Sequence, residues 1–317
     1  MKRAPKKIVV IAEYSASSGF GNLVRSVELA SEFAKFETTE LLICTEFEAT
    51  CKPILPEAPN YEVKFFNNLA NLIQSVSDLD HAILDCPSSI SERAASAIKD
   101  KFPLSTVTAL DCPYECKDFD LRISLFDGVL NTLETTTKDH KVGIDFAIIS
   151  KNVKIVQERV RVPEVLVKFS GKKSNLLAVT EEIIRDVFQE ADFNVCIINN
   201  GSDGVNNTDF KEQADFLNRL STCSLYVGSG VTTLFEASLL ETPAIFIGSN
   251  EAERQFGMAI SKAHSVTTLD STRIEFIEEL RSLLKGVLQS NQFERFIPKI
   301  EVDFFGAQRI VDLVLQS

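Results

Sequence analysis

Short apolar runs alternate with amphipathic stretches along the whole chain. Such runs are typical of buried parallel strands, and apolar residues three and four positions apart indicate helices that pack on a sheet. The predicted strands are 8–12, 40–44, 81–85, 106–111, 121–124, 164–169, 193–198, 224–227, 244–247 and 265–269. The predicted helices are 23–36, 68–77, 91–101, one that ends at 189, 210–220, 233–240, 251–263, 272–290 and 304–315. This alternation predicts an α/β protein with parallel sheets covered on both faces.

The strand–helix pattern restarts at Pro163, and a length of 317 residues favours two domains. The two series predict two doubly wound, Rossmann-like domains over 1–158 and 159–302. The amphipathic segment 303–317 is expected to pack back on the first domain. Ligands of open parallel sheets bind beyond the carboxyl ends of the strands, so the expected site is a cleft between the two domains.

The turn after the predicted strand 224–227 is the strongest candidate for a ligand site. Segment 228–236 reads GSGVTTLFE, so a strand ends in Gly-x-Gly and turns into a helix. Such a turn presents backbone N–H groups at the positive end of a helix dipole, where a diphosphate can bind, and an acid one turn later could accept ribose hydroxyls. The predicted nucleotide-binding residues are Gly228, Ser229, Gly230, Thr232, Thr233 and Glu236. The alternative is a glycine turn that only packs a helix onto its sheet.

A second glycine turn follows the first predicted strand, where segment 17–25 reads SSGFGNLVR. Gly19 and Gly21 would let the backbone approach a ligand, and the helix beginning near Asn22 would point its positive end at that ligand. Arg25 lies one turn into this helix. The third glycine of the dinucleotide-binding fingerprint is absent, and a tight turn with a surface arginine is the competing interpretation.

Composition excludes several classes of function. A net charge of −12 argues against a nucleic-acid backbone as the main partner. Seven cysteines in a long chain suggest reduced, cytoplasmic usage, and their spacing fits no common zinc site, so neither a metal nor a cofactor is expected. The sequence has no uninterrupted apolar stretch of about 18 residues, so no membrane span is predicted. The apolar run after the basic N-terminus is interrupted at Glu13 without a cleavage site, which favours a strand over a signal peptide.

Several segments together carry a resemblance to a known family. They are Glu13, Ser15 and the 17–25 turn, TALDCP at 108–113, GIDFAII at 143–149, VLVKFSG at 165–171, the 228–236 turn, and Asn250, Glu251 and Gln255. In order and spacing they resemble the PseG-type UDP-sugar hydrolases of pseudaminic acid synthesis and the related spore-coat polysaccharide proteins. The resemblance implies the GT-B architecture of many nucleotide-sugar enzymes, with Gly171 in the nucleotide site. It also implies sugar contacts from Gly19, Gly21, Arg25, Asn250 and Gln255.

The chain departs from this family at one decisive position, because the family's catalytic histidine falls on Asn22. An amide can position a substrate but cannot accept a proton at neutral pH. Another acid could serve as the base, and Glu13, Asp85 and Asp111 are the candidates, each at a predicted strand end. A buried carboxylate can have its pKa raised toward neutrality. Each of the three could instead simply cap a turn.

These observations predict a nucleotide-sugar processing enzyme of surface polysaccharide or nonulosonic acid biosynthesis. Its ligand would be a UDP-sugar, cleaved at the anomeric carbon by hydrolysis or transfer, with helix ends rather than a metal carrying the diphosphate charge. One alternative is a glycosyltransferase with a sugar or peptide acceptor. Another, of a different class, is a non-catalytic binding or scaffold protein that keeps the fold. The sequence leaves the sugar, the acceptor and the oligomeric state open.

Overall fold

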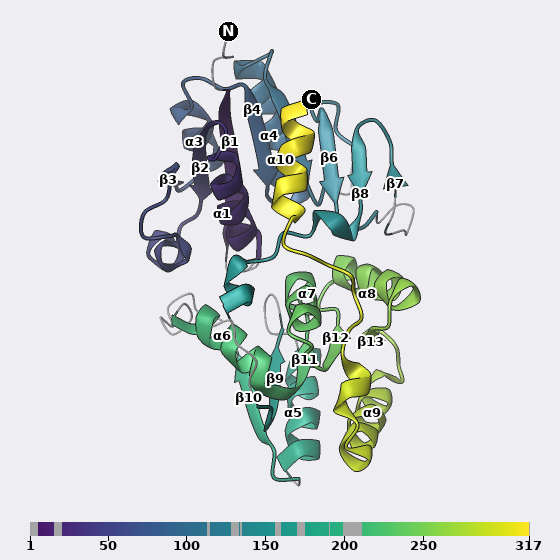
Figure 1. Ribbon diagram of the computed structural model, residues 1–317. Helices are drawn as coiled ribbons and strands as arrows, with labels where there is room; N and C mark the ends of the chain where they lie inside the picture. Colours follow the sequence, from purple (N-terminus) through teal and green to yellow (C-terminus); the bar gives the residue numbers. More distant parts are fainter. Residues whose placement is uncertain are drawn as a thin grey trace. The chain divides into compact units, whose positions relative to one another are not determined.

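The computed structural model describes residues 6–15, 21–112, 115–127, 133, 135–155, 160–169, 175–189, 191–198 and 211–316. The chain divides into two compact units (Figure 1). The first unit comprises Met1–Ser150 together with Asp303–Ser317, and the second comprises Lys151–Val302. In the described part of the chain, no helix combines the length and the apolar character that spanning a membrane requires.

The first unit is built on an eight-stranded sheet with the strand order β3-β2-β1-β4-β5-β6-β8-β7. Its strands are β1 (Lys7–Glu13), β2 (Thr38–Cys44), β3 (Glu62–Phe66), β4 (His81–Asp85), β5 (Thr106–Leu110), β6 (Leu121–Ser124), β7 (Thr135–Thr136) and β8 (His140–Val142). All neighbouring pairs are parallel except β7 with β8. The chain extends from β1 first toward β3 and then through β4 in the opposite direction, so the sheet is doubly wound with its switch point between β1 and β4.

Helices cover both faces of this first sheet (Figure 1). They are α1 (Gly21–Phe33), α2 (Glu48–Cys51), α3 (Leu69–Ser75), α4 (Ser88–Lys101) and α10 (Gly306–Gln316), with short 3-10 turns η1 (Lys52–Ile54) and η2 (Ile144–Phe146). Alternation along β1 sends Ile8 and Val10 into a core with α1 and α10, and Val9 and Ile11 into a core with α3 and α4. The C-terminal helix α10 packs against α1 and η2, within the first unit.

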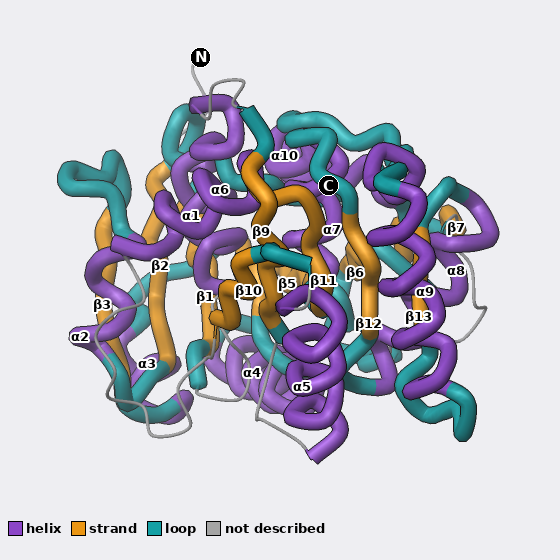
Figure 2. The backbone as a smooth tube through the Cα atoms, turned by 90° about the horizontal axis from the view of Figure 1, so that it is seen from below, coloured by secondary structure: helices purple, strands orange, loops and turns teal. Residues whose placement is uncertain are grey.

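The second unit has a five-stranded parallel sheet with the order β10-β9-β11-β12-β13 (Figure 2). Its strands are β9 (Val162–Lys168), β10 (Asn194–Ile198), β11 (Cys223–Gly228), β12 (Ala244–Ile247) and β13 (Thr267–Leu269). Its helices are α5 (Asn175–Gln189), α6 (Lys211–Thr222), α7 (Val231–Leu239), α8 (Glu251–Ala263) and α9 (Phe276–Ser290), with 3-10 turns η3 (Lys151–Ile155) and η4 (Phe293–Phe296). Helices α5 and α9 share one core with the sheet. The switch point lies between β9 and β11.

The predicted α/β class with two doubly wound parallel sheets is confirmed. The sequence pattern misses β3, β7, β8 and α2, which are short or lie at a sheet edge. Strand β5 ends at Leu110 rather than at Asp111, because Asp111 adopts a left-handed conformation with φ 48°. Helix α9 begins at Phe276 rather than at 272, because Asp270 accepts hydrogen bonds from the backbone and hydroxyl of Thr272 and forms a turn there.

Candidate functional site

The glycine turn of the second unit lies at the switch point of its sheet. Strand β11 ends at Gly228, which pairs with Lys168 at the end of β9. A Cβ atom on Gly228 would lie 1.9 Å from the carbonyl oxygen of Lys168, so only glycine fits there. The backbone N–H of Ser229 donates to the same oxygen at 3.0 Å. The carboxyl ends of β9 and β11 are therefore held tightly together under the turn.

Gly230 directs the chain from this turn into α7. Its φ of 99° and ψ of 111° place it in a region that favours glycine. The side chains of the described residues provide no cap for the N-terminus of α7, although Thr232 and Thr233 lie in its first turn. The first backbone N–H groups of a helix have no partners within the helix. This end of α7 thus offers donors and a positive dipole end to an anion.

Glu236 is buried one turn further along α7, with 4% of its surface exposed. Burial raises the pKa of its carboxyl to about 7, against an opposing effect from Lys168. Helical side chains lean toward the N-terminus, so this carboxyl leans toward the glycine turn. Tyr226 is fully buried beneath the turn, and its hydroxyl donates to the carbonyl oxygen of Ser229 at 2.7 Å. Burial, followed by the charges of Glu253 and Glu236, raises the pKa of that hydroxyl well above its usual value.

In the first unit, Arg25 on α1 joins the ends of two strands. Its Nε donates to Oδ2 of Asp85 at 2.9 Å and its Nη2 donates to Oδ1, while its Nη1 pairs with Asp111. The hydroxyl of Ser26 donates to Oδ2 of Asp85 at 3.0 Å. Burial lowers the pKa of Arg25, but Asp85 and Asp111 outweigh burial and raise the pKa above its usual value. Arg25 is therefore a permanent cation fixed at the carboxyl ends of β4 and β5.

The other predicted residues of the first unit surround this ion pair. Asn22 lies one turn before Arg25, with 3.5 Å between its Oδ1 and Nη2 of Arg25. Asp111 also accepts a hydrogen bond from the backbone of Leu125 at 3.1 Å. Glu13 ends β1 and is 9% exposed, close enough to act on the thiols of Cys44 and Cys86, whose pKa values burial raises first and Glu13 raises further. The structure thus brings Asn22, Arg25, Asp85 and Asp111 together at one edge of the sheet.

Asn250 and Gln255 lie at the start of α8 in the second unit. Asn250 is the N-cap, and its side chain accepts from the backbone of Glu253 at 3.0 Å. Glu253 in turn accepts from the backbone and the hydroxyl of Ser249, the residue before the N-cap, at 2.8 and 2.6 Å, so both side chains hold the start of α8. The amide of Gln255 donates to Glu251 at 2.9 Å. Both predicted sugar-binding residues thus also organise the first turn of α8.

Two predicted residues, Gly19 and Gly171, lie outside the described part of the chain. Gly21 is described and begins α1, with no heavy atom within 4 Å of the position that a Cβ would take. The sequence pattern does not single out Ser26, Tyr226 or Lys168, which complete the two clusters. For Lys168 the sequence does hold a signal, because side chains alternate along β9 and place Lys168 on the face of the sheet opposite Val165 and Val167.

The chain can be compared with known proteins at two levels. No protein-family model matches it, and no curated protein matches it in sequence. Solved structures match along nearly the whole chain. The UDP-GlcNAc 2-epimerase of Methanocaldococcus jannaschii, in complex with UDP-GlcNAc and UDP, has a TM-score of 0.68 at 11% identity over 98% of this chain and 100% of that chain.

Two further structures extend the comparison. The UDP-GlcNAc 2-epimerase of Neisseria meningitidis, bound to UDP-GlcNAc, has a TM-score of 0.66 at 9% identity over 98% of this chain and 100% of that chain. The calicheamicin glycosyltransferase has a TM-score of 0.56 at 12% identity over 99% and 98% of the two chains. Identities this low establish only the fold. The chain accordingly has the two-domain, Rossmann-like architecture called GT-B.

Proposed function

We propose that this protein binds a UDP-sugar, or a closely related nucleotide sugar, and acts on the sugar at its anomeric carbon. The proposal depends on the glycine turn of 228–230, which leads into the N-terminus of α7. No side chain of a described residue caps this N-terminus, and Glu236 is buried one turn later. Solved neighbours with the same fold were crystallised with UDP or UDP-GlcNAc, which supports a nucleotide-sugar ligand.

The proposal assigns the nucleotide to the second unit. Gly228 and Ser229 would shape the turn, since the N–H of Ser229 already donates to Lys168. The N–H groups of Gly230 and of the first turn of α7 would bind the diphosphate, because they lie at a helix N-terminus. The hydroxyls of Thr232 and Thr233 would add donors there. Glu236 would accept the ribose hydroxyls, and Gly171 would line the site. Asn250 and Gln255 would contact the sugar.

The proposal assigns the acceptor and the proton transfers to the first unit, through Gly19, Gly21, Asn22 and Arg25. Among the candidate acids, Asp85 and Asp111 both accept hydrogen bonds from Arg25, and Asp85 is fully buried. Their contacts favour a role in holding Arg25 in place. Glu13, at the end of the neighbouring strand β1, is the acid that we propose as the general base.

Cleavage would transfer the sugar either to water or to a hydroxyl of an acceptor. In both cases the bond between the anomeric carbon and the diphosphate oxygen breaks, and the helix dipole and N–H groups stabilise the departing diphosphate. Asn22 in place of a basic residue favours an acceptor other than water. The resemblance of the sequence supports a role in surface polysaccharide or nonulosonic acid biosynthesis, and the cysteine usage supports a cytoplasmic location.

Epimerisation of the sugar is a second candidate. The UDP-GlcNAc 2-epimerases among the structural neighbours have TM-scores of 0.61–0.68, above the 0.54–0.58 of the glycosyltransferases. An epimerase would return a nucleotide sugar with one inverted carbon and would give no net release of UDP. The products therefore separate this candidate from the first.

Calorimetry with UDP followed by product analysis tests these proposals. The wild-type chain is expected to bind UDP and to release it from UDP-GlcNAc or another UDP-sugar when an acceptor is present. Release without an acceptor would identify a hydrolase, and an inverted sugar without release would identify an epimerase. Binding without any turnover would favour a scaffold protein. Absence of UDP binding would refute the proposed nucleotide site.

A further inference from the structure

Tyr226 lies beneath the glycine turn of the second unit. Its neighbours Leu225 and Val227 on β11 pack into the core with α5 and α9, so alternation along the strand sends the Tyr226 side chain to the opposite face of the sheet. The residue is fully buried there. A buried hydroxyl is costly to the fold unless it is hydrogen-bonded, so the partners of this phenol identify its role.

The hydroxyl of Tyr226 contacts two backbone carbonyl oxygens. It lies 2.7 Å from the oxygen of Ser229 and 3.2 Å from that of Lys168. A phenol has one proton to donate, and the Lys168 oxygen already accepts from the N–H of Ser229 at 3.0 Å. The proton is therefore assigned to the Ser229 carbonyl, at the shorter distance. Only glycine leaves room for this contact at position 228, because a Cβ on Gly228 would lie 2.7 Å from the Tyr226 hydroxyl.

This hydrogen bond fixes the orientation of the peptide group between Ser229 and Gly230. A planar trans peptide directs its C=O and its N–H to opposite sides. Since the Ser229 oxygen points inward to the phenol, the N–H of Gly230 points away from it. Gly230 is partly exposed, and within the described part of the chain no backbone group accepts from its N–H. The turn thus uses one N–H, that of Ser229, to hold the strands together and leaves the next one available.

We propose that Tyr226 is a positioning residue for the diphosphate, and that its hydroxyl holds the Ser229–Gly230 peptide so that the N–H of Gly230 is presented to a diphosphate oxygen. This inference rests on the proposed nucleotide site and adds a residue to it. A donor that is already oriented binds an anion more strongly, because no reorientation is needed on binding.

The chemistry of the phenol suits this role. Burial is the main cause that raises the pKa of the Tyr226 hydroxyl well above its usual value, so the group keeps the proton that it donates. Without the hydroxyl, the Ser229 carbonyl would lose this buried donor, and the peptide would no longer be held in one orientation. The ring would remain to fill the core.

The test compares the affinities of the full chain for UDP and for uridine, measured by calorimetry with uridine as a competitor. Tyr226→Phe removes only the hydroxyl, and it is expected to bind UDP roughly tenfold more weakly than wild type, near the lower end of what a hydrogen bond to a charged group contributes. Uridine lacks the diphosphate, so its affinity should be unchanged. A merely structural role would weaken both ligands alike.

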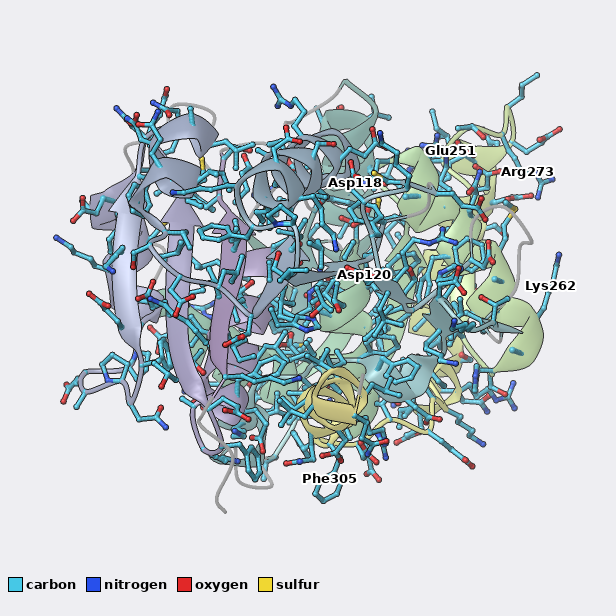
Figure 3. The ribbon with its side chains drawn as sticks, turned by 90° about the horizontal axis from the view of Figure 1, so that it is seen from above. Asp118, Asp120, Glu251, Lys262, Arg273 and Phe305 are labelled. Carbon is cyan, nitrogen blue, oxygen red and sulfur yellow. The ribbon has the colours of Figure 1, made fainter. Side chains whose placement is uncertain are left out.

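Two control variants accompany this test. Tyr61→Phe removes the hydroxyl of a tyrosine that is buried in the first unit, and it should bind both ligands as wild type does. Lys262→Met removes a positive charge from the surface of the second unit, where Lys262 is exposed on α8 and projects away from the protein (Figure 3). It shows how far general charge attraction alone distinguishes UDP from uridine.

A second measurement uses the wild-type chain and does not depend on the folding of Tyr226→Phe. The chain is isotopically labelled at serine carbonyls and glycine nitrogens, so that only Ser-Gly pairs give signals in the NMR spectrum. The amide proton of Gly230 is expected to shift downfield on addition of UDP, because it forms a hydrogen bond to a charged oxygen, and to stay in place on addition of uridine.

Four results would overturn the inference. A Tyr226→Phe variant equal to wild type in UDP affinity would show that the hydroxyl has no role, while leaving the nucleotide site intact. A loss by the same factor for UDP and uridine would show general damage. A Gly230 amide proton that does not shift when UDP binds would show that this N–H does not meet the diphosphate. Wild-type protein that binds no UDP would overturn the nucleotide site and this inference together.

Discussion

Two buried carboxylates, Asp85 in the first unit and Glu236 in the second, have very different surroundings. Asp85 is fully buried and accepts hydrogen bonds from Arg25 Nε, Arg25 Nη2 and Ser26 Oγ. Glu236 is almost as deeply buried, but the cation that acts on it is a lysine engaged with Phe216. Burial raises the pKa of both carboxyls. At Asp85 the hydrogen bonds from Arg25 and Ser26 oppose that shift and fix the carboxylate in a framework, whereas at Glu236 the charge of Lys168 opposes it, and a carboxylate of this kind is costly to the fold and suited to a ligand.

Breaking the ion pair between Arg25 and Asp85 should have the largest effect on stability. Arg25→Met would leave Asp85 buried without its cation, and the free energy of unfolding is expected to fall by about 3–5 kcal/mol. Urea unfolding of the full chain measures this loss. Asp85→Asn in the Arg25→Met background removes the stranded charge and should recover part of the stability. The comparison fails if Arg25→Met leaves stability unchanged, or if the second substitution recovers nothing.

Removing the charge of Glu236 should instead stabilise the fold at higher pH. Burial raises the pKa of Glu236 from 4.5 to about 7, so between these pH values the folded chain keeps a proton that the unfolded chain releases. Stability is therefore lost as pH rises through this window, by up to about 3 kcal/mol. Glu236→Gln does not titrate, and its stability relative to wild type should rise between pH 4.5 and pH 7.

Unfolding midpoints at pH 5 and pH 8 measure this difference. Asp85→Asn is the matched control at the other carboxylate, and it should lose stability at both pH values because it breaks hydrogen bonds with Arg25 and Ser26. An equal offset between Glu236→Gln and wild type at pH 5 and pH 8 would mean that Glu236 is already ionised in the folded protein at pH 5.

The cost to stability should be matched by a gain in binding. Glu236→Ala is expected to weaken UDP binding by about 1–3 kcal/mol, because a charge-assisted hydrogen bond to the ribose is lost. Calorimetry at pH 8 measures it, with Glu278→Ala as the control, since Glu278 is exposed on α9. Unchanged affinity in Glu236→Ala would remove this carboxylate from the nucleotide site.

The fold could be predicted from sequence where burial is complete. Strands β1 and β4 are buried along nearly their whole length, and their apolar runs identify them. Strand β3 was missed because every residue of it is at least partly exposed, and it lies at the sheet edge. Such a strand has no strong apolar run and is recognised only once β2 is in place beside it.

The candidate sites could be predicted only where their residues lie close together in the sequence. Gly228 and Gly230 stand two residues apart between a strand and a helix, so their turn is readable from the sequence, and the positive φ of 99° at Gly230 is a local need for glycine. The contacts of Arg25 with Asp85 and Asp111 span 60 and 86 residues, so no spacing rule indicates them. The charge of Lys168 likewise acts on Glu236 only through tertiary packing, because β9 packs beside α6 and α6 beside α7.

Asn22→His is expected to have the smallest effect on stability but a specific effect on the reaction. Asn22 is partly exposed at the start of α1, so the substitution should change stability by less than about 0.5 kcal/mol. An imidazole at this position can accept a proton, which the amide cannot. If the turn faces the sugar, release of UDP from a UDP-sugar in the absence of an acceptor should increase.

Asn22→Gln is the matched control, because it keeps an amide and adds bulk. The imidazole would stand beside the permanent charge of Arg25, since Nη2 of Arg25 lies 3.5 Å from the present side chain. That charge disfavours protonation of the ring, so the imidazole stays neutral and able to accept a proton at neutral pH. A histidine variant that releases no more UDP than the glutamine variant would show that the cluster of Asn22, Arg25 and Asp85 does not face the sugar and serves the fold alone.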